Sequence, residues 1–266
     1  MTLDLVLKLL DILHGFGRLF GVVHIILLTA IRFSMQRQFN LYHEGDSLSR
    51  DIFQFWSEIP DDACEHPADR QVLQHIKHNF APDCLPQAYR GRLRTAPVVL
   101  LFLSPGLDPD DPAHCADGKG RRYYAGQRTG ECDLPEEKDH PSAYRWLSKI
   151  VRQFGINYEQ ALSTVATLNI GAYKSVKFDD WPMLAALPSS RVCLDWAQSV
   201  LFPQAEAGER VVVCLRSPKY WGLGKDEGVG SLYCPPCTRG AIMLRGDMRD
   251  RVTNAVKDAV ESHAKR

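Results

Sequence analysis

The stretch Pro97-Val-Val-Leu-Leu-Phe-Leu103, which runs directly into Ser104-Pro-Gly-Leu-Asp-Pro109, decides the fold class of this chain. Six of the first seven residues are apolar and none is charged, which is typical of a strand buried on both faces of a parallel sheet. Ligands of open α/β sheets bind outside the carboxyl ends of the strands, and a glycine there lets backbone N–H groups approach them closely. The Ser-Pro-Gly corner is therefore either a candidate active site or simply the turn that ends the strand.

Three further short apolar runs follow, and each of them ends in Gly, Pro or polar residues: 165–170, 211–215 and 230–234. Amphipathic helical patterns lie between and after these runs, at 141–155, 189–202 and from about residue 246 onwards. Alternation of strands and helices favours a parallel sheet that carries helices on both faces. We therefore predict an α/β fold with a short parallel sheet of about four strands and an N-terminal helical extension.

The order of these four segments resembles the uracil-DNA glycosylase superfamily, over roughly residues 95–260. The motifs that carry the resemblance are Leu103-Ser-Pro-Gly106, Leu168-Asn169 and Cys234-Pro-Pro-Cys237. In that family the loop after the first strand positions the attacking water, and a later strand ends in an Asn that reads the pyrimidine edge. The loop after the last strand enters the DNA minor groove. The resemblance implies a three-layer fold and hydrolysis of an N-glycosidic bond in DNA repair.

The resemblance also implies roles for individual residues. Ser104 or Asp108 would place the water, and Asn169 would read the base together with the backbone at Gly106. The loop after the last strand and the residues after Asn169 would contact the DNA backbone or its phosphates: Lys174, Ser175, Pro235, Thr238 and Arg239.

Residues 108–135 are predicted to form a long loop, because the segment is rich in glycine and charge. Long loops at a sheet edge are usually functional or disordered. Tyr123 and Tyr124 lie within this segment, and aromatic rings in such a place stack on a flipped base. We interpret the segment as part of the base-binding site.

Two departures from the family pattern weaken the expectation of catalysis. Ser104 stands where the family has Asn or Asp, and a serine hydroxyl is not a base without a neighbour that takes its proton. Pro235 or Pro236 replaces the imidazole that would support charge on the leaving base, and one lost donor of this kind costs ~100- to 1000-fold in rate. The alternatives are a non-catalytic module that binds a nucleobase or nucleic acid, and a metal-binding interaction protein.

The composition is that of an ordinary folded protein. The chain has 266 residues, enough for one α/β domain with extensions, and its 32 basic residues equal its 32 acidic residues. The protein therefore has no net positive charge that would attract nucleic acid, and a nucleic-acid partner requires a local basic surface. Basic residues cluster in three places, which are either phosphate contacts or solvated loops: 90–94, 119–122 and 174–177.

The eight cysteines are scattered along the chain and follow no clean secretory segment, so we expect reduced thiols in the cytoplasm. Cys234 and Cys237 have a CxxC spacing, to which Cys115, Cys132, His114 and His140 are conceivable additional ligands. A lone CxxC is a weak metal signal. We therefore predict no metal and no cofactor, and the sequence leaves the oligomeric state open.

Residues 1–34 are predicted to be an apolar leader or extension. The apolar run 19–31 is too short for a clear membrane span, and extending it towards the N-terminus takes in Arg18. The segment is then a membrane-surface helix, a helix docked on the domain, or an untranslated stretch before a start at Met35. We expect residues 35–96 to be a helical part that packs on the core, and residues 97–266 to be the core itself.

Overall fold

Residues Val98–Phe102 form strand β2, which lies in the middle of the sheet, and all five are buried. The structure is a computed structural model that describes residues 51–179, 181–224 and 228–265. These residues belong to one compact unit. The predicted leader, residues 1–34, lies outside the described residues. None of the helices in the described ranges is both long and apolar enough to cross a membrane.

The sheet has six strands in the order β1-β3-β2-β4-β6-β5. The five strands other than β2 are β1 (Tyr89–Arg90), β3 (Val165–Asn169), β4 (Val211–Cys214), β5 (Gly228–Val229) and β6 (Leu232–Tyr233). Strands β3, β2, β4 and β6 pair in parallel, whereas the edge strands β1 and β5 pair antiparallel to their neighbours. The α/β class is confirmed, but the sheet is mixed and larger than the predicted short parallel sheet. The two edge strands have two residues each, too few to show the alternation of apolar and polar residues by which a strand is predicted.

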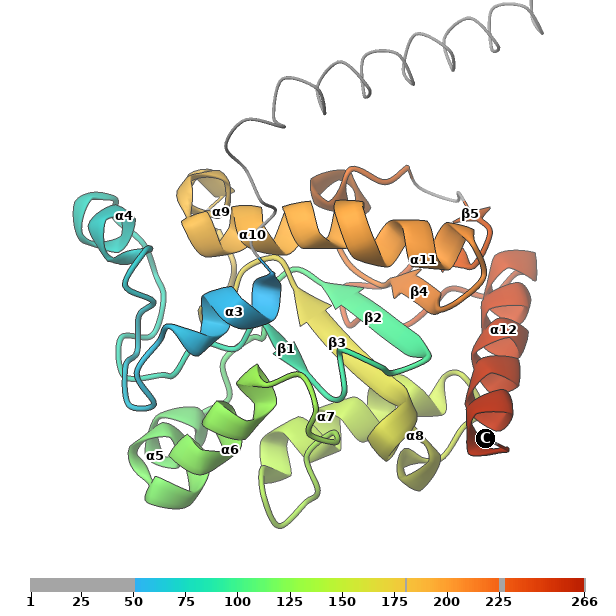
Figure 1. Cartoon of the computed structure of the whole chain (residues 1–266), viewed down its shortest axis with the longest axis horizontal. Coiled ribbons are helices and arrows are strands. Elements are labelled where there is room, and N and C mark those ends of the chain that lie inside the picture. Colours follow the sequence, from blue (N-terminus) through green and yellow to red (C-terminus); the bar gives the residue numbers. More distant parts are fainter. Residues whose placement is uncertain (1–50, 180, 225–227, 266) are drawn as a thin grey trace, which may run out of the picture. The chain divides into compact units, whose positions relative to one another are not determined.

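Helices pack on both faces of the sheet (Figure 1). Side chains of β2 alternate between two hydrophobic clusters, with Val99 and Leu101 in one and Leu100 and Phe102 in the other. The first cluster is covered by α3 (Ile52–Ser57), α10 (Pro188–Trp196), the π-helical segment η1 (Ala197–Leu201) and α11 (Phe202–Glu206). The second is covered by α7 (Pro141–Arg152), α8 (Tyr158–Thr164) and α12 (Asp247–Ala264). The remaining elements are α4 (Arg70–His75), α9 (Trp181–Ala186) and the 3₁₀ helix η2 (Pro218–Trp221).

The segment predicted as a long loop contains two helices, α5 (Asp111–Ala116) and α6 (Gly118–Arg128), so that prediction is wrong. Asp117 begins α6, because its carboxylate accepts hydrogen bonds from the backbone N–H groups of Lys119 and Gly120. Gly120 lies so close to α5 that a Cβ there would be 1.8 Å from the carbonyl oxygen of His114. Gly120, one of the glycines that favoured a loop in the sequence, thus allows α5 and α6 to approach each other.

Candidate functional site

The carboxyl ends of β2 and β3 meet at one edge of the sheet. Phe102 is the register partner of Asn169, and the ladder continues where Ile170 N–H donates to Phe102 O at 3.2 Å and Gly171 N–H to Leu103 O at 2.8 Å. The loop that begins at Ser104 therefore starts directly beside the loop after β3. Strands that follow β2 in sequence lie on both sides of it, so the strand order reverses between β2 and β4, and the loop after β2 borders this topological switch point, where α/β sheets bind ligands.

Asn169 is 2% exposed at the end of β3. Its side-chain Nδ2 donates to the carbonyl oxygen of Gln87 at 3.2 Å, and its backbone N–H donates to Ala88 O at 2.7 Å. The amide thus holds the segment before β1 against the end of β3. One of its side-chain donors is used structurally, and its backbone carbonyl accepts from the Cys193 thiol at 3.1 Å, whereas its side-chain oxygen Oδ1 makes no hydrogen bond with another described residue.

The loop after β2 is half-buried at Ser104, Gly106 and Asp108. Gly106 has a positive φ of 70°, and a Cβ there would meet nothing within 4 Å, so the turn needs a glycine for its backbone conformation alone. The Asp108 carboxylate accepts a hydrogen bond from the N–H of Asp110 at 3.2 Å. Asp108 therefore contributes to the local turn, which occupies part of its capacity to hold a water.

Lys174, which we predicted to contact a DNA phosphate, is instead buried in an ion pair. Its Nζ lies 2.9 Å from Oδ2 of Asp111, and the two side chains are 1% and 3% exposed. The same Asp111 oxygen accepts the backbone N–H of Asp108 at 2.8 Å, so the pair ties the loop after β2 to the loop after β3. Burial lowers the pKa of Lys174, as does the nearby Arg90, while Asp111 opposes both.

Histidine and tyrosine side chains surround this ion pair. His140 Nε2 lies 3.5 Å from Asp111 Oδ1 and 3.3 Å from the hydroxyl oxygen of Tyr124. The ring of His114 stacks at a tilt on that of His140, with 4.2 Å between the centroids. We call these residues, with the buried Arg90, the buried polar cluster: Arg90, Asp111, His114, Tyr124, His140 and Lys174.

The two tyrosines do not lie on an open loop. Tyr124 is 1% exposed, and the Nζ of Lys174 lies 5.6 Å from the centre of its ring. The Tyr123 hydroxyl is buried, and the side chains of Gln87 and Arg90 lie beside it. Both side chains come from α6 and pack against the buried polar cluster, so stacking on a flipped base would require α6 to move.

A cysteine next to the buried polar cluster is acidic for a thiol. The pKa of Cys115 is lowered to about 6, chiefly because Cys84 hydrogen-bonds to it and the N–H of Leu85 donates to its Sγ at 3.2 Å. Lys174 also favours the charged form of this thiol, while Asp111 and Cys115 both favour the charged form of Lys174.

Of the other residues predicted to contact the DNA backbone, some lie in the interior of the protein and others on its surface. Ser175 is buried and its hydroxyl has no hydrogen-bond partner in the described ranges. Pro235 is buried, whereas Thr238 and Arg239 are exposed, and Thr238 Oγ1 accepts a hydrogen bond from the N–H of Ile242 at 3.3 Å. Of the predicted backbone contacts, only Thr238 and Arg239 are exposed to a partner.

The cysteines form no metal centre in the part of the chain that the structure describes. None of the eight forms a disulfide in the described ranges, and no three His, Cys, Asp or Glu side chains are grouped there so as to hold a metal ion. Comparison of the chain with protein-family models, with curated proteins and with solved structures finds no match.

The acid stability of the protein should depend on His140. Burial, Arg90 and Lys174 lower its pKa to about 2, from 6.5. Below pH 6.5 the unfolded chain therefore binds a proton that the folded chain does not, so stability falls as the pH falls. We expect His140 alone to reduce the unfolding free energy by about 1.4 kcal/mol between pH 7.5 and 5.5.

Urea denaturation at a series of pH values measures this slope. His140→Asn keeps a side chain that can cap α7 and should flatten the profile, whereas the exposed His75→Asn should leave it unchanged. Burial lowers the pKa of His66 and His114 too, so part of the slope should remain. An unchanged profile in His140→Asn would show that His140 stays accessible to protons in the folded protein.

Proposed function

We propose that this chain is a divergent member of the uracil-DNA glycosylase-like fold that binds a nucleobase, free or in DNA, at the carboxyl edge of β2 and β3. The observation that carries the proposal is the register of the two strands, which sets Asn169 opposite Phe102 and the loop from Ser104 beside Gly171. These are the two places to which the resemblance assigns base reading and water positioning. The parallel order of β3, β2, β4 and β6 and the helices on both faces are compatible with such a three-layer fold.

In the proposed site the side-chain oxygen Oδ1 of Asn169 accepts a hydrogen bond from the Watson–Crick edge of the base. The turn at Gly106 brings backbone N–H groups close to the ligand. The exposed Thr238 and Arg239 contact the DNA backbone. In a catalytic variant of this site, water would add to the sugar carbon as the N-glycosidic bond breaks, and the base would leave with a proton.

Binding is better supported than turnover. Ser104 has no carboxylate or amide with which to hold a water, and the Asp108 carboxylate accepts a hydrogen bond within its own turn. The loop after β6 supplies Pro235, which cannot donate to a leaving base. We therefore favour a nucleobase-binding protein with weak excision, and a non-catalytic module that binds the same ligand is the second candidate.

Asn169→Ala should weaken binding to oligonucleotides that carry the recognised base by ~10- to 100-fold, because a buried polar partner is left unpaired. Duplex and single-stranded oligonucleotides with uracil, hypoxanthine or a thymine mismatch provide the ligands. Fluorescence anisotropy measures binding, and the same samples report any excised base. The matched control is Asn254→Ala, on the exposed face of α12.

A modest loss of stability is also expected, because Asn169 anchors Gln87. The two roles are separated by measuring the melting temperature alongside the affinity. A large fall in melting temperature with unchanged base affinity would make Asn169 a structural residue only. No binding of any of these oligonucleotides by the wild-type chain would contradict the proposed function.

A further inference from the structure

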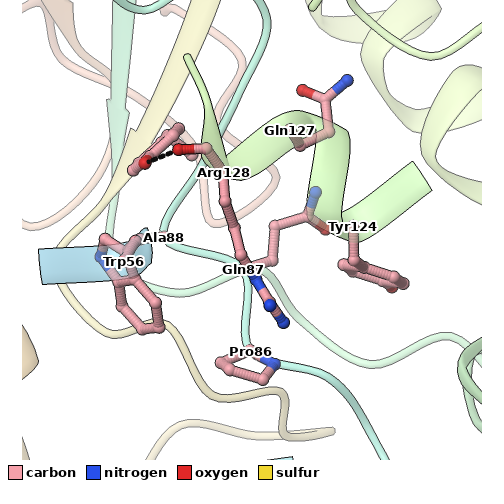
Figure 2. A pocket seen from close by; sticks show the side chains of 8 residues that line it. Trp56, Pro86, Gln87, Ala88, Tyr124, Gln127 and Arg128 are labelled. Atoms are coloured by element: carbon pink, nitrogen blue, oxygen red, sulfur yellow. Dashed lines mark hydrogen bonds between the residues drawn. The ribbon is translucent and has the colours of Figure 1, made fainter. Parts of the chain in front are cut away.

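A small cavity lies where α6 passes α3 and the segment before β1. Its volume is about 10 Å³, which is the room that one water-sized atom needs. Figure 2 shows the side chain of Arg128 reaching from the end of α6 down to Gln87 and Pro86, with the ring of Trp56 on the other side. The cavity borders the proposed base site, because Gln87 and Ala88 line it and accept hydrogen bonds from Asn169, but Arg128 has no role in that site.

The guanidinium of Arg128 is only partly neutralised by the protein. Its Nη1 donates to the backbone carbonyls of Ile59 and Pro60 at 3.4 and 3.3 Å. A carboxylate oxygen of Asp61 lies 3.9 Å from Nη1, but the Asp61 side chain is 79% exposed, whereas that of Arg128 is 10% exposed. An exposed carboxylate at this distance is screened by water, so it offsets little of the buried charge.

The other edge of the same guanidinium has no partner. Nε and Nη2 of Arg128 are buried and make no hydrogen bond with a described residue. These two N–H groups point the same way and form the fork with which arginine binds carboxylates and other anions. Gln87 is 3% exposed and also lines the cavity, and its amide lies beside the Tyr123 hydroxyl.

An unpaired buried cation with unused donors is costly, and proteins avoid it by pairing the charge. Burial lowers the pKa of Arg128, which reflects the same cost. A water molecule would accept one of the hydrogen bonds, but it would leave the charge unbalanced. A phosphate or sulfate ion has several heavy atoms and does not fit a cavity of about 10 Å³.

We propose that the Nε/Nη2 edge of Arg128 binds a single small monovalent anion of the halide class in this cavity, between α6 and the segment before β1. The ion neutralises Arg128 and joins the end of α6 to the segment before β1. The backbone carbonyl oxygen of Gln87 accepts the hydrogen bond from Asn169 Nδ2. The ion therefore stabilises the segment that holds Asn169. The inference concerns the stability of the fold and does not depend on the proposed nucleobase ligand.

The melting temperature of the full chain in sodium chloride, compared with sodium gluconate at equal ionic strength, tests this site. Chloride at several times its dissociation constant should raise the melting temperature by about 2–4 °C. Arg128→Gln should abolish the difference between the two salts. Arg122→Gln replaces an exposed arginine of the same helix and should keep it.

Crystals of the wild-type protein grown or soaked in sodium bromide provide a measurement that does not require the variant to fold. We expect an anomalous bromide peak within hydrogen-bond distance of Arg128 Nε and Nη2. A peak of water density there without anomalous signal would overturn the proposal, whatever the salts do to the melting temperature. Equal melting temperatures of the wild type in chloride and gluconate would overturn it as well.

Discussion

Asp111→Asn is expected to lower the free energy of unfolding by about 3–5 kcal/mol, the usual effect of removing one partner of a buried ion pair. Lys174 would be left 1% exposed, without the carboxylate that lies 2.9 Å from its Nζ. The substitution also weakens the hydrogen bond that Asp108 N–H makes to the same carboxylate. The loops after β2 and β3 would then lose their direct connection, so the effect should extend to the proposed site.

Urea denaturation of the full chain at pH 7.5 measures the change. The exposed pair Lys177–Asp179, with 2.8 Å between its charged atoms, provides the control, and Asp179→Asn should cost less than about 1 kcal/mol. Combining Asp111→Asn with Lys174→Met removes the unpaired charge and should recover most of the stability. A loss below about 1 kcal/mol in Asp111→Asn would mean that Lys174 reaches solvent or deprotonates at little cost.

Gly91→Ala should be about as damaging, with an expected loss of about 3–5 kcal/mol from strain and overpacking together. Gly91 follows β1 and has a φ of 80°, a conformation that side chains rarely adopt. A Cβ there would lie 2.5 Å from the carbonyl oxygen of Val165 and 3.0 Å from the Cα of Ala166. Both atoms belong to the backbone of β3, which cannot move aside without disturbing the centre of the sheet.

The comparison with Gly208→Ala separates the two contributions. Gly208 has a similar φ of 76°, but a Cβ there meets nothing within 4 Å, so this variant should cost only about 1–2 kcal/mol for the backbone conformation. Thermal and urea denaturation of the two variants give the difference. Equal losses would show that β1 shifts away from β3 without penalty, contrary to the close approach described above.

The sequence by itself predicted the parts of the fold whose residues are buried along a continuous run. The runs at 97–103, 165–170 and 211–215 contain β2, β3 and β4, since a strand covered on both faces must be apolar at nearly every position. The helical pattern at 141–155 contains α7, because one face of that helix is buried against the sheet. Neither β1 nor α6 was predicted, because a two-residue strand has no period and the glycines of α6 are characteristic of loops.

For the candidate site the sequence predicted the strand ends, and the parallel pairing of β2 with β3 places the loop from Ser104 beside the loop after Asn169. The buried polar cluster was decided by the tertiary structure. Its residues come from segments that are distant in the chain. In the sequence nothing distinguishes Lys174 from a solvated lysine, whereas in the structure Asp111 lies 2.9 Å from its Nζ. A strand that is buried on both faces consists of consecutive apolar residues, so the sequence alone reveals it. The pairing of buried charges depends on distances between elements, which only the folded chain determines.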